Sequence, residues 1–216
     1  MTRPGVLGRL QTELEALHAV EAGGRVEDFL VSEGALVRLG VARPRAPEQV
    51  LVLEGDDELS LAVYLDEQVL ATLGEIRADP RALLARGLRV FSLALEGVSH
   101  FLYLAHRAAA GRRVSLLELE LQAEIDKFAV ASLHLARAGR RDRLPALLRR
   151  LFDEVSYLPH LDGEELERYR TANRLARDYC RSLLPLVAGG RIEAFLQELR
   201  RVFRLGAGEK LGHLTA

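Results

Sequence analysis

Hydrophobic positions follow helical spacing along most of the chain and strand-like runs in one region. The leucines of residues 5–21 recur every three or four positions, which predicts an amphipathic helix. Two apolar runs with β-branched residues, 49–53 and 59–65, flank a turn that contains Gly and Asp, and they predict a β-hairpin. Because a lone hairpin is only marginally stable in water, we expect a third strand, for which residues 35–39 are the candidate.

From Asp66 onward the pattern is helical almost to the end of the chain. Asp66 can cap a short helix that runs to Leu73. The pair Asp79–Pro80 predicts the start of a long helix over residues 80–109. The Asp carboxylate can accept hydrogen bonds from free backbone amides there, and Pro suits the first helical position.

Two capping boxes predict where the next long helices begin. Ser115 is followed by Glu118, and Asp162 is followed by Glu165. In each pair the first side chain can bond to the amide of the third helical residue, and the Glu can bond back to the cap residue. The first box therefore predicts a helix over residues 115–137, and the second predicts another long helix.

The end of the chain completes the predicted fold. The long helix that begins at the Asp162 capping box is expected to end at Pro185. A last amphipathic helix is expected over residues 192–205. We predict an α+β protein that is mostly α, with a helix and β-hairpin region over residues 1–77 and a helical bundle over residues 78–206. Residues 207–216 are expected to form a flexible tail.

Two of the predicted helices carry polar stripes that match each other. The stripe on the helix of residues 80–109 consists of Glu96, His100, Tyr103 and Arg107. The stripe on the helix of residues 115–137 consists of Glu120, Glu124, Lys127 and His134. Each set shares one helix face by its spacing. If the chain folds back at the short loop near Gly111, an acid faces a base or a hydroxyl at each step: Tyr103 opposite Glu120, His100 opposite Glu124, and Glu96 opposite Lys127.

The helix of residues 115–137 has a second polar arc, formed by Glu118, Gln122 and Asp126. Apolar faces separate the two arcs, so this helix is expected to pack between layers, with one arc open to water and the other enclosed. The matching of the two stripes predicts that the enclosed arc is the one that contains Glu120 and Glu124.

Three interpretations of the matched stripes remain open. The favoured one is an ionic network that fixes the register of the helices. The second is a cleft that binds a small molecule or performs catalysis, with His100 as the acid and base and Glu124 as the group that orients it. Its ligand-binding residues would be Glu96, Tyr103, Arg107, Glu120 and Lys127, with Asn173 reaching in from a third helix.

The third interpretation, a metal site, is the least favoured. Its ligands would be Glu96, His100, Glu120 and Glu124. Di-metal carboxylate sites in helical bundles use a repeated Glu-x-x-His motif, whereas Glu96 and His100 are four residues apart and the pattern occurs once. Lys127 and Arg107 would also neutralise the carboxylates that a divalent ion needs. We therefore predict no metal and no cofactor.

The charge is balanced overall but unevenly distributed. The 216 residues carry a net charge of −1, whereas residues 1–75 hold 14 Asp and Glu against 6 Arg, a net of −8, so the remainder carries +7. The Arg-rich segment 137–150 lacks interleaved aromatic residues, which argues against nucleic-acid binding. The chain has only two lysines, Lys127 and Lys210, beside 28 arginines. With 49% hydrophobic residues it can bury a sizeable core.

The sequence contains none of the common catalytic motifs, such as a Walker A loop, GxGxxG, HExxH or GxSxG. The leading functional prediction is therefore a non-enzymatic interaction or scaffold protein. It would bind a protein partner or form a homo-oligomer through its Leu-rich helices. The enzyme or ligand-binding cleft described above is the alternative. A sole cysteine, Cys180, and the lack of a signal peptide or long apolar span predict a cytoplasmic protein without a membrane partner.

Overall fold

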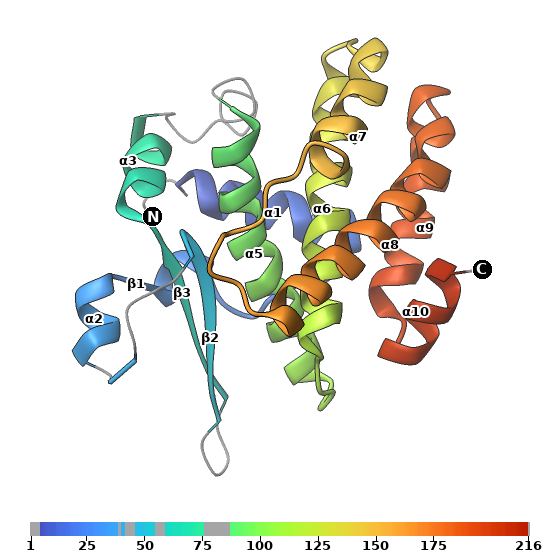
Figure 1. Ribbon diagram of the computed structural model, residues 1–216. Helices are drawn as coiled ribbons and strands as arrows, with labels where there is room; N and C mark the ends of the chain where they lie inside the picture. The colour runs from blue at the N-terminus through green and yellow to red at the C-terminus, as the bar shows by residue number, and fades with distance from the viewer. Residues whose placement is uncertain (1–4, 39, 42–45, 55–58, 76–86, 216) are drawn as a thin grey trace. The chain divides into compact units, whose positions relative to one another are not determined.

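The computed structural model describes residues 5–38, 40–41, 46–54, 59–75 and 87–215, and Figure 1 shows the course of the chain. These residues form a mostly helical protein with one small sheet, which confirms the predicted fold class. The chain divides into two compact units. The first consists of residues 1–15 and 20–112, and the second of residues 16–19 and 113–216.

The first unit contains a three-stranded sheet in the order β1-β3-β2. Strands β2 (Glu48–Glu54) and β3 (Leu59–Leu65) pair in antiparallel fashion, which confirms the predicted hairpin. The third strand, β1 (Leu30–Val31), is parallel to β3.

The sequence predicts the third strand at residues 35–39, and this prediction is wrong. Residues Glu33–Arg38 form helix α2 instead. The hydroxyl of Ser32 accepts a hydrogen bond from the amide of Ala35 at 3.2 Å, and this local cap favours a helix over an extended strand.

The first unit also contains helices. They are α1 (Val6–His18), whose last residues 16–18 group with the second unit, the 3-10 helix Val26–Phe29, α2, α3 (Glu67–Glu75) and α5 (Leu88–Ala109). Helix α5 packs on β2 and β3, as Figure 1 shows. The side chain of Asp66 accepts a hydrogen bond from the amide of Gln68 at 2.8 Å, which confirms the predicted cap of α3. The predicted helix start at Asp79–Pro80 lies outside the described residues.

The second unit is a helical bundle. Its elements are α6 (Leu116–Arg137), the 3-10 helix Arg141–Arg143, α7 (Leu144–Phe152), α8 (Gly163–Ala188), α9 (Ile192–Arg204) and α10 (Ala207–Thr215). Helices α6 and α7 pack against each other and against α8, and α9 and α10 also contact α8 (Figure 1). Both predicted capping boxes are present at the starts of α6 and α8.

Two details near the chain end differ from the sequence analysis. Pro185 does not end α8, because it lies inside the last turn and the helix continues to Ala188. Residues 207–215, expected to be a flexible tail, form α10. This helix is held in place by Lys210, whose side chain is fully buried, and its first turn is capped by a hydrogen bond from the amide of Gly206 to Glu209.

The two units do not follow the predicted regions 1–77 and 78–206. Helix α5 groups with the sheet, so the first unit extends to Arg112. Residues 16–19, the end of α1 and the residue after it, group with the second unit although they lie near the start of the chain. Contacts made by this short segment therefore belong to the helical bundle.

Candidate functional site

The residues of the predicted polar cleft are divided between the two units. Helix α5 of the first unit carries Glu96, His100, Tyr103 and Arg107. The second unit carries Glu120, Glu124 and Lys127 on α6 and Asn173 on α8. The predicted pairing of the two stripes and the metal interpretation both join residues of different units, so both stay predictions.

Within the first unit, His100 is close to a carboxylate that the sequence analysis did not select. Its Nδ1 lies 3.3 Å from Oε1 of Glu48, the first residue of β2. Both side chains are buried. The pairing follows from the packing of α5 across the sheet, which brings residues 52 positions apart into contact.

Tyr103 and Arg107, predicted to share one helix face, contact each other on α5. Nη2 of Arg107 donates a hydrogen bond to the hydroxyl of Tyr103 at 2.6 Å, and the guanidinium lies 4.8 Å from the centre of the phenol ring. Both residues are buried. A buried guanidinium is costly unless it is hydrogen-bonded, so this contact contributes to satisfying Arg107.

In the second unit, Lys127 donates a hydrogen bond to Glu124 at 2.7 Å, one turn earlier on α6. Lys127 is buried, whereas Glu124 is partly exposed. The carboxylate of Glu124 also influences two nearby groups. Burial raises the pKa of the Cys180 thiol well above its usual value, and Glu124 and Asp126 add to the rise. Burial likewise raises the pKa of Tyr157, with Glu124 acting in the same direction and Arg170 against it.

Asn173, predicted to reach into the cleft from a third helix, is buried on α8. Among the described residues, no group accepts a hydrogen bond from its Nδ2. Asn173 therefore adds a buried donor to the bundle without completing a contact to Glu124 or Lys127.

The second polar arc of α6, which the sequence analysis expects to face water, is the more deeply buried of the two. Gln122 is 1% exposed and Asp126 is 0% exposed. In the other arc Lys127 and His134 are buried as well, whereas Glu120 and Glu124 are half-buried. Nε2 of Gln122 donates to Oδ1 of Asp126 at 2.8 Å. The correction has a physical cause, because these two side chains find polar partners from other elements of the same unit.

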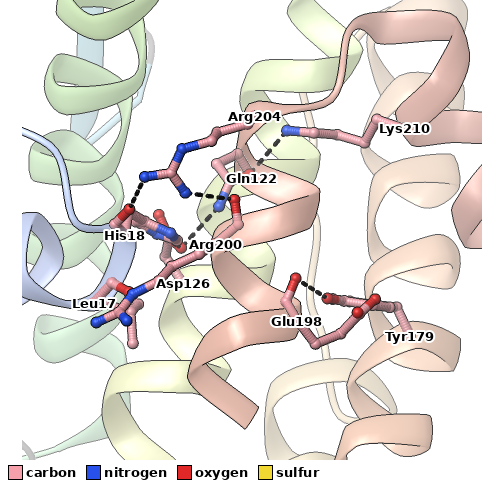
Figure 2. A network of polar contacts seen from close by, with 9 residues as sticks. All are labelled: Leu17, His18, Gln122, Asp126, Tyr179, Glu198, Arg200, Arg204 and Lys210. Carbon is pink, nitrogen blue, oxygen red and sulfur yellow. Dashed lines mark hydrogen bonds and ion pairs between the residues drawn. The ribbon is translucent and has the colours of Figure 1, made fainter. Parts of the chain in front are cut away.

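Those partners come from opposite ends of the chain, as Figure 2 shows. Nε2 of His18, at the end of α1, lies 2.8 Å from Oδ1 of Asp126. Nζ of Lys210, on α10, donates to Oε1 of Gln122 at 2.9 Å. His18 and Lys210 are both fully buried, and the His18 ring stacks on Phe203 with a centroid distance of 4.0 Å. We refer to His18, Asp126, Gln122 and Lys210 as the buried network.

Two arginines of α9 hold the end of α1 beside this network (Figure 2). Arg200 donates to the carbonyl oxygens of Ala16 and Leu17 at 3.1 and 3.0 Å. Arg204 donates to those of His18 and Ala19 at 2.9 and 3.1 Å. The last carbonyl groups of a helix have no partner within the helix, so the two guanidinium groups take the place of a C-terminal cap.

The chemistry of the buried network is that of a structural contact. Asp126 and Lys210 carry opposite charges and are bridged by the Gln122 amide, and the ring of His18 is packed against Phe203. None of these four side chains is open to solvent. The arrangement joins His18, at the end of α1, to α6, α9 and α10 of the same unit and gives no access to a substrate.

Sequence reasoning missed this network although part of its signal was present. His18 follows the leucines of α1 at helical spacing, which places a polar ring on the buried stripe of that helix. Lys210 is one of two lysines in an arginine-rich chain, and both lysines are buried. No pattern in the sequence pairs either residue with α6, however, because they lie about 90 to 110 residues away from their partners.

A different kind of surface lies on the first unit, at the free edge of β2. In the sheet order β1-β3-β2, no described strand pairs with the outer side of β2. The amide of Asp66 donates to the carbonyl oxygen of Pro47 at 2.8 Å, in register with the antiparallel ladder. Because bonding directions alternate along an antiparallel strand, the main-chain groups of Gln49 and Leu51 point to β3, and those of Val50 and Val52 point outward.

The outward groups of Val50 and Val52 have no hydrogen-bond partner among the described residues. The side chain of Val52 is 40% exposed, one of the few large apolar side chains that are exposed in the described part of the chain. An edge with free main-chain groups and apolar side chains is able to pair with another strand. We call Glu48–Glu54 with its outward main-chain groups the β2 edge.

Comparison of the chain with models of protein families, with curated protein sequences and with solved structures finds no match. Among the described helices, α5 is the one whose length and composition would allow it to cross a membrane. In its most apolar 18-residue stretch, 56% is buried inside the protein, and the core helix of a soluble protein passes the same test.

Proposed function

We propose that this protein is a non-enzymatic interaction protein that binds an extended segment of a protein partner along the β2 edge. The observation that carries the proposal is the pair of outward main-chain groups at Val50 and Val52, which have no partner among the described residues. A segment that lies beside β2 can bond to these groups and extend the sheet. The partner is another protein or a second copy of this chain.

The leucine-rich helices offer less support for self-association than the sequence suggests. Most leucines of the described helices are buried in the core. Among them only Leu116 is strongly exposed, at 58%. The β2 edge provides directional bonding that a single exposed side chain does not. The proposed compartment is the cytoplasm, on the support of the single free thiol of Cys180.

The test uses two variants of Val52, one without and one with a main-chain N–H group at this position. Val52→Pro removes the outward amide, and an outward-facing position on an edge strand tolerates Pro without loss of the ladder to β3. Val52→Thr keeps that amide and the β-branched shape. We expect partner retention in pull-downs, or self-association measured by light scattering, to fall about tenfold or more in the Pro variant and to persist in the Thr variant.

Circular dichroism of both variants serves as the control for folding. Equal association by the folded Pro and Thr variants would remove the β2 edge from the proposal. A strict monomer that retains no partner in any form would remove the interaction function itself.

A further inference from the structure

The chemistry around the β2 edge restricts which segment can bind there; this inference rests on the proposed function. The side chains of Val50 and Val52 share one face of the sheet, and Leu51 lies on the other, because neighbouring residues of a strand alternate. An added strand places its own side chains beside these residues on both faces. Apolar or β-branched residues at its centre would therefore match the edge.

The end of the edge near Glu48 is acidic. Glu48 pairs with Leu65, which is followed directly by Asp66 and Glu67. The side chains of Asp66 and Glu67 are both at least partly exposed. Burial raises the pKa of Tyr64, which pairs with Gln49, and the carboxylates of Asp66, Glu33 and Glu67 add to that rise. Asp66 and Glu67 directly follow β3 at the end beside Glu48, whereas Glu33 follows β1 on the far side of β3.

The charge of the wider region agrees with this local picture. The first unit, residues 1–15 and 20–112, holds 16 Asp and Glu against 12 Arg, a net of −4. A second copy of the chain would bring a first unit with the same net negative charge.

We propose that the β2 edge binds an extended protein segment with β-branched residues at its centre and Arg or Lys at the end that lies beside Glu48. The central residues pair with the outward main-chain groups of Val50 and Val52. The basic end is attracted by Asp66 and Glu67. A second copy of the chain could offer the same β2 edge for pairing, but the region around its edge carries a net negative charge.

The probe is a fluorescein-labelled peptide, Arg-Val-Thr-Val-Thr-Val-Arg with blocked termini, which carries arginine at both ends so that either strand direction is tested. One comparison peptide has Glu in place of both Arg. Another carries N-methyl groups on alternate residues, so that one edge of the peptide cannot donate hydrogen bonds. Binding to the full chain is measured by fluorescence anisotropy in about 50 mM and about 500 mM salt, on either side of the range in which exposed charges become screened.

The wild-type chain and Val52→Thr are expected to bind the Arg probe. Binding should weaken at least about tenfold with the Glu peptide, with the N-methylated peptide, with the higher salt and with Val52→Pro. The N-methylated peptide keeps the test valid if the Pro variant does not fold, because it needs no change in the protein.

The alternative results separate this inference from the proposed function. If the Arg and Glu peptides bind the wild-type chain equally well and Val52→Pro weakens both, the β2 edge stands and the charge preference is overturned. If no peptide binds but Val52→Pro abolishes self-association, a second copy is the occupant, which overturns the basic segment and leaves the interaction function in place. If neither the Pro variant nor N-methylation changes anything, both proposals fall.

Discussion

The carboxylate of Asp126 touches two buried side chains at once, the ring of His18 and the amide of Gln122. Replacing it with Ala would leave both without this partner in a site that water does not reach. Removing one member of a buried ionic or hydrogen-bonded pair typically costs about 3–5 kcal/mol. We predict a loss of that size for Asp126→Ala in urea unfolding. Asp142→Ala is the matched control, because Asp142 is 65% exposed and an exposed pair contributes about 0–1 kcal/mol.

An Asp126→Ala protein with nearly wild-type stability would show that the buried network contributes little. The double variant with Lys210→Met gives a second measure. Since Lys210 reaches Asp126 through Gln122, the two single effects should not add, and the coupling should be about 0.5–3 kcal/mol.

Alkaline pH should destabilise the second unit through Tyr179 and Cys180, which are neighbours on α8. Burial raises the pKa of both side chains above their ordinary values; for Tyr179 the carboxylate of Glu198 adds to the effect. Their stabilisation is therefore fully present below the unfolded-state pKa values, about 8.5 for Cys and 10 for Tyr. It declines as the pH rises above them, because the unfolded chain loses protons that the folded chain retains.

Tyr179→Phe removes one of these two protons. We predict a change within about 1 kcal/mol at pH 7, where the long 3.4 Å hydrogen bond to Glu198 is the main loss. Above pH 10 the variant should lose stability less steeply than the wild type, by up to about 1.4 kcal/mol per pH unit. Urea unfolding between pH 7 and pH 11 measures both values. Parallel curves for the two proteins would contradict the burial of the phenol.

At the scale of elements, the attachment of the end of α1 depends on Arg200 and Arg204 of α9. Arg204→Met keeps the aliphatic stem and removes the hydrogen bonds to His18 and Ala19. Hydrogen bonds from charged groups contribute about 1.5–3 kcal/mol. We predict a loss in that range, with faster amide hydrogen exchange in the last turn of α1.

The same helix offers a matched control for this prediction. Arg201 is 61% exposed and forms a 3.5 Å ion pair with Glu198 one turn earlier. Arg201→Met should cost no more than about 0.5 kcal/mol and should leave the exchange in α1 unchanged. Equal effects of the two substitutions would mean that α1 is held by apolar packing alone.

Elements whose signals are local were predictable, and those that need distant partners were not. The capping box of Ser115 and Glu118 lies within four residues, so the start of α6 could be read from the sequence. Strand β1 is only two residues long and exists because Leu30 and Val31 pair with β3, which no local pattern indicates. The polar arcs of α6 were recognised, but the burial of Gln122 and Asp126 was not predicted, since their partners His18 and Lys210 lie far away in sequence.

At the scale of the whole molecule, the two units are not consecutive along the chain. Residues 16–19 belong to the second unit, while the parts of the chain before and after them belong to the first. The predicted regions, 1–77 and 78–206, place helix α5 with the bundle. In the structure α5 packs on β2 and β3 and groups with the sheet.

The burial of both lysines protects the folded protein from proteases and enzymes that act on lysine side chains. Lys127 and Lys210 are 6% and 0% exposed, and the chain has no other lysine. Lysyl endopeptidase should therefore leave the native chain intact and cleave it only when the second unit opens, so the rate of cleavage would report the population of the opened state. Acetylation or ubiquitin attachment at a lysine side chain would likewise require the second unit to open. The arginine side chains on the surface are not substrates for either modification.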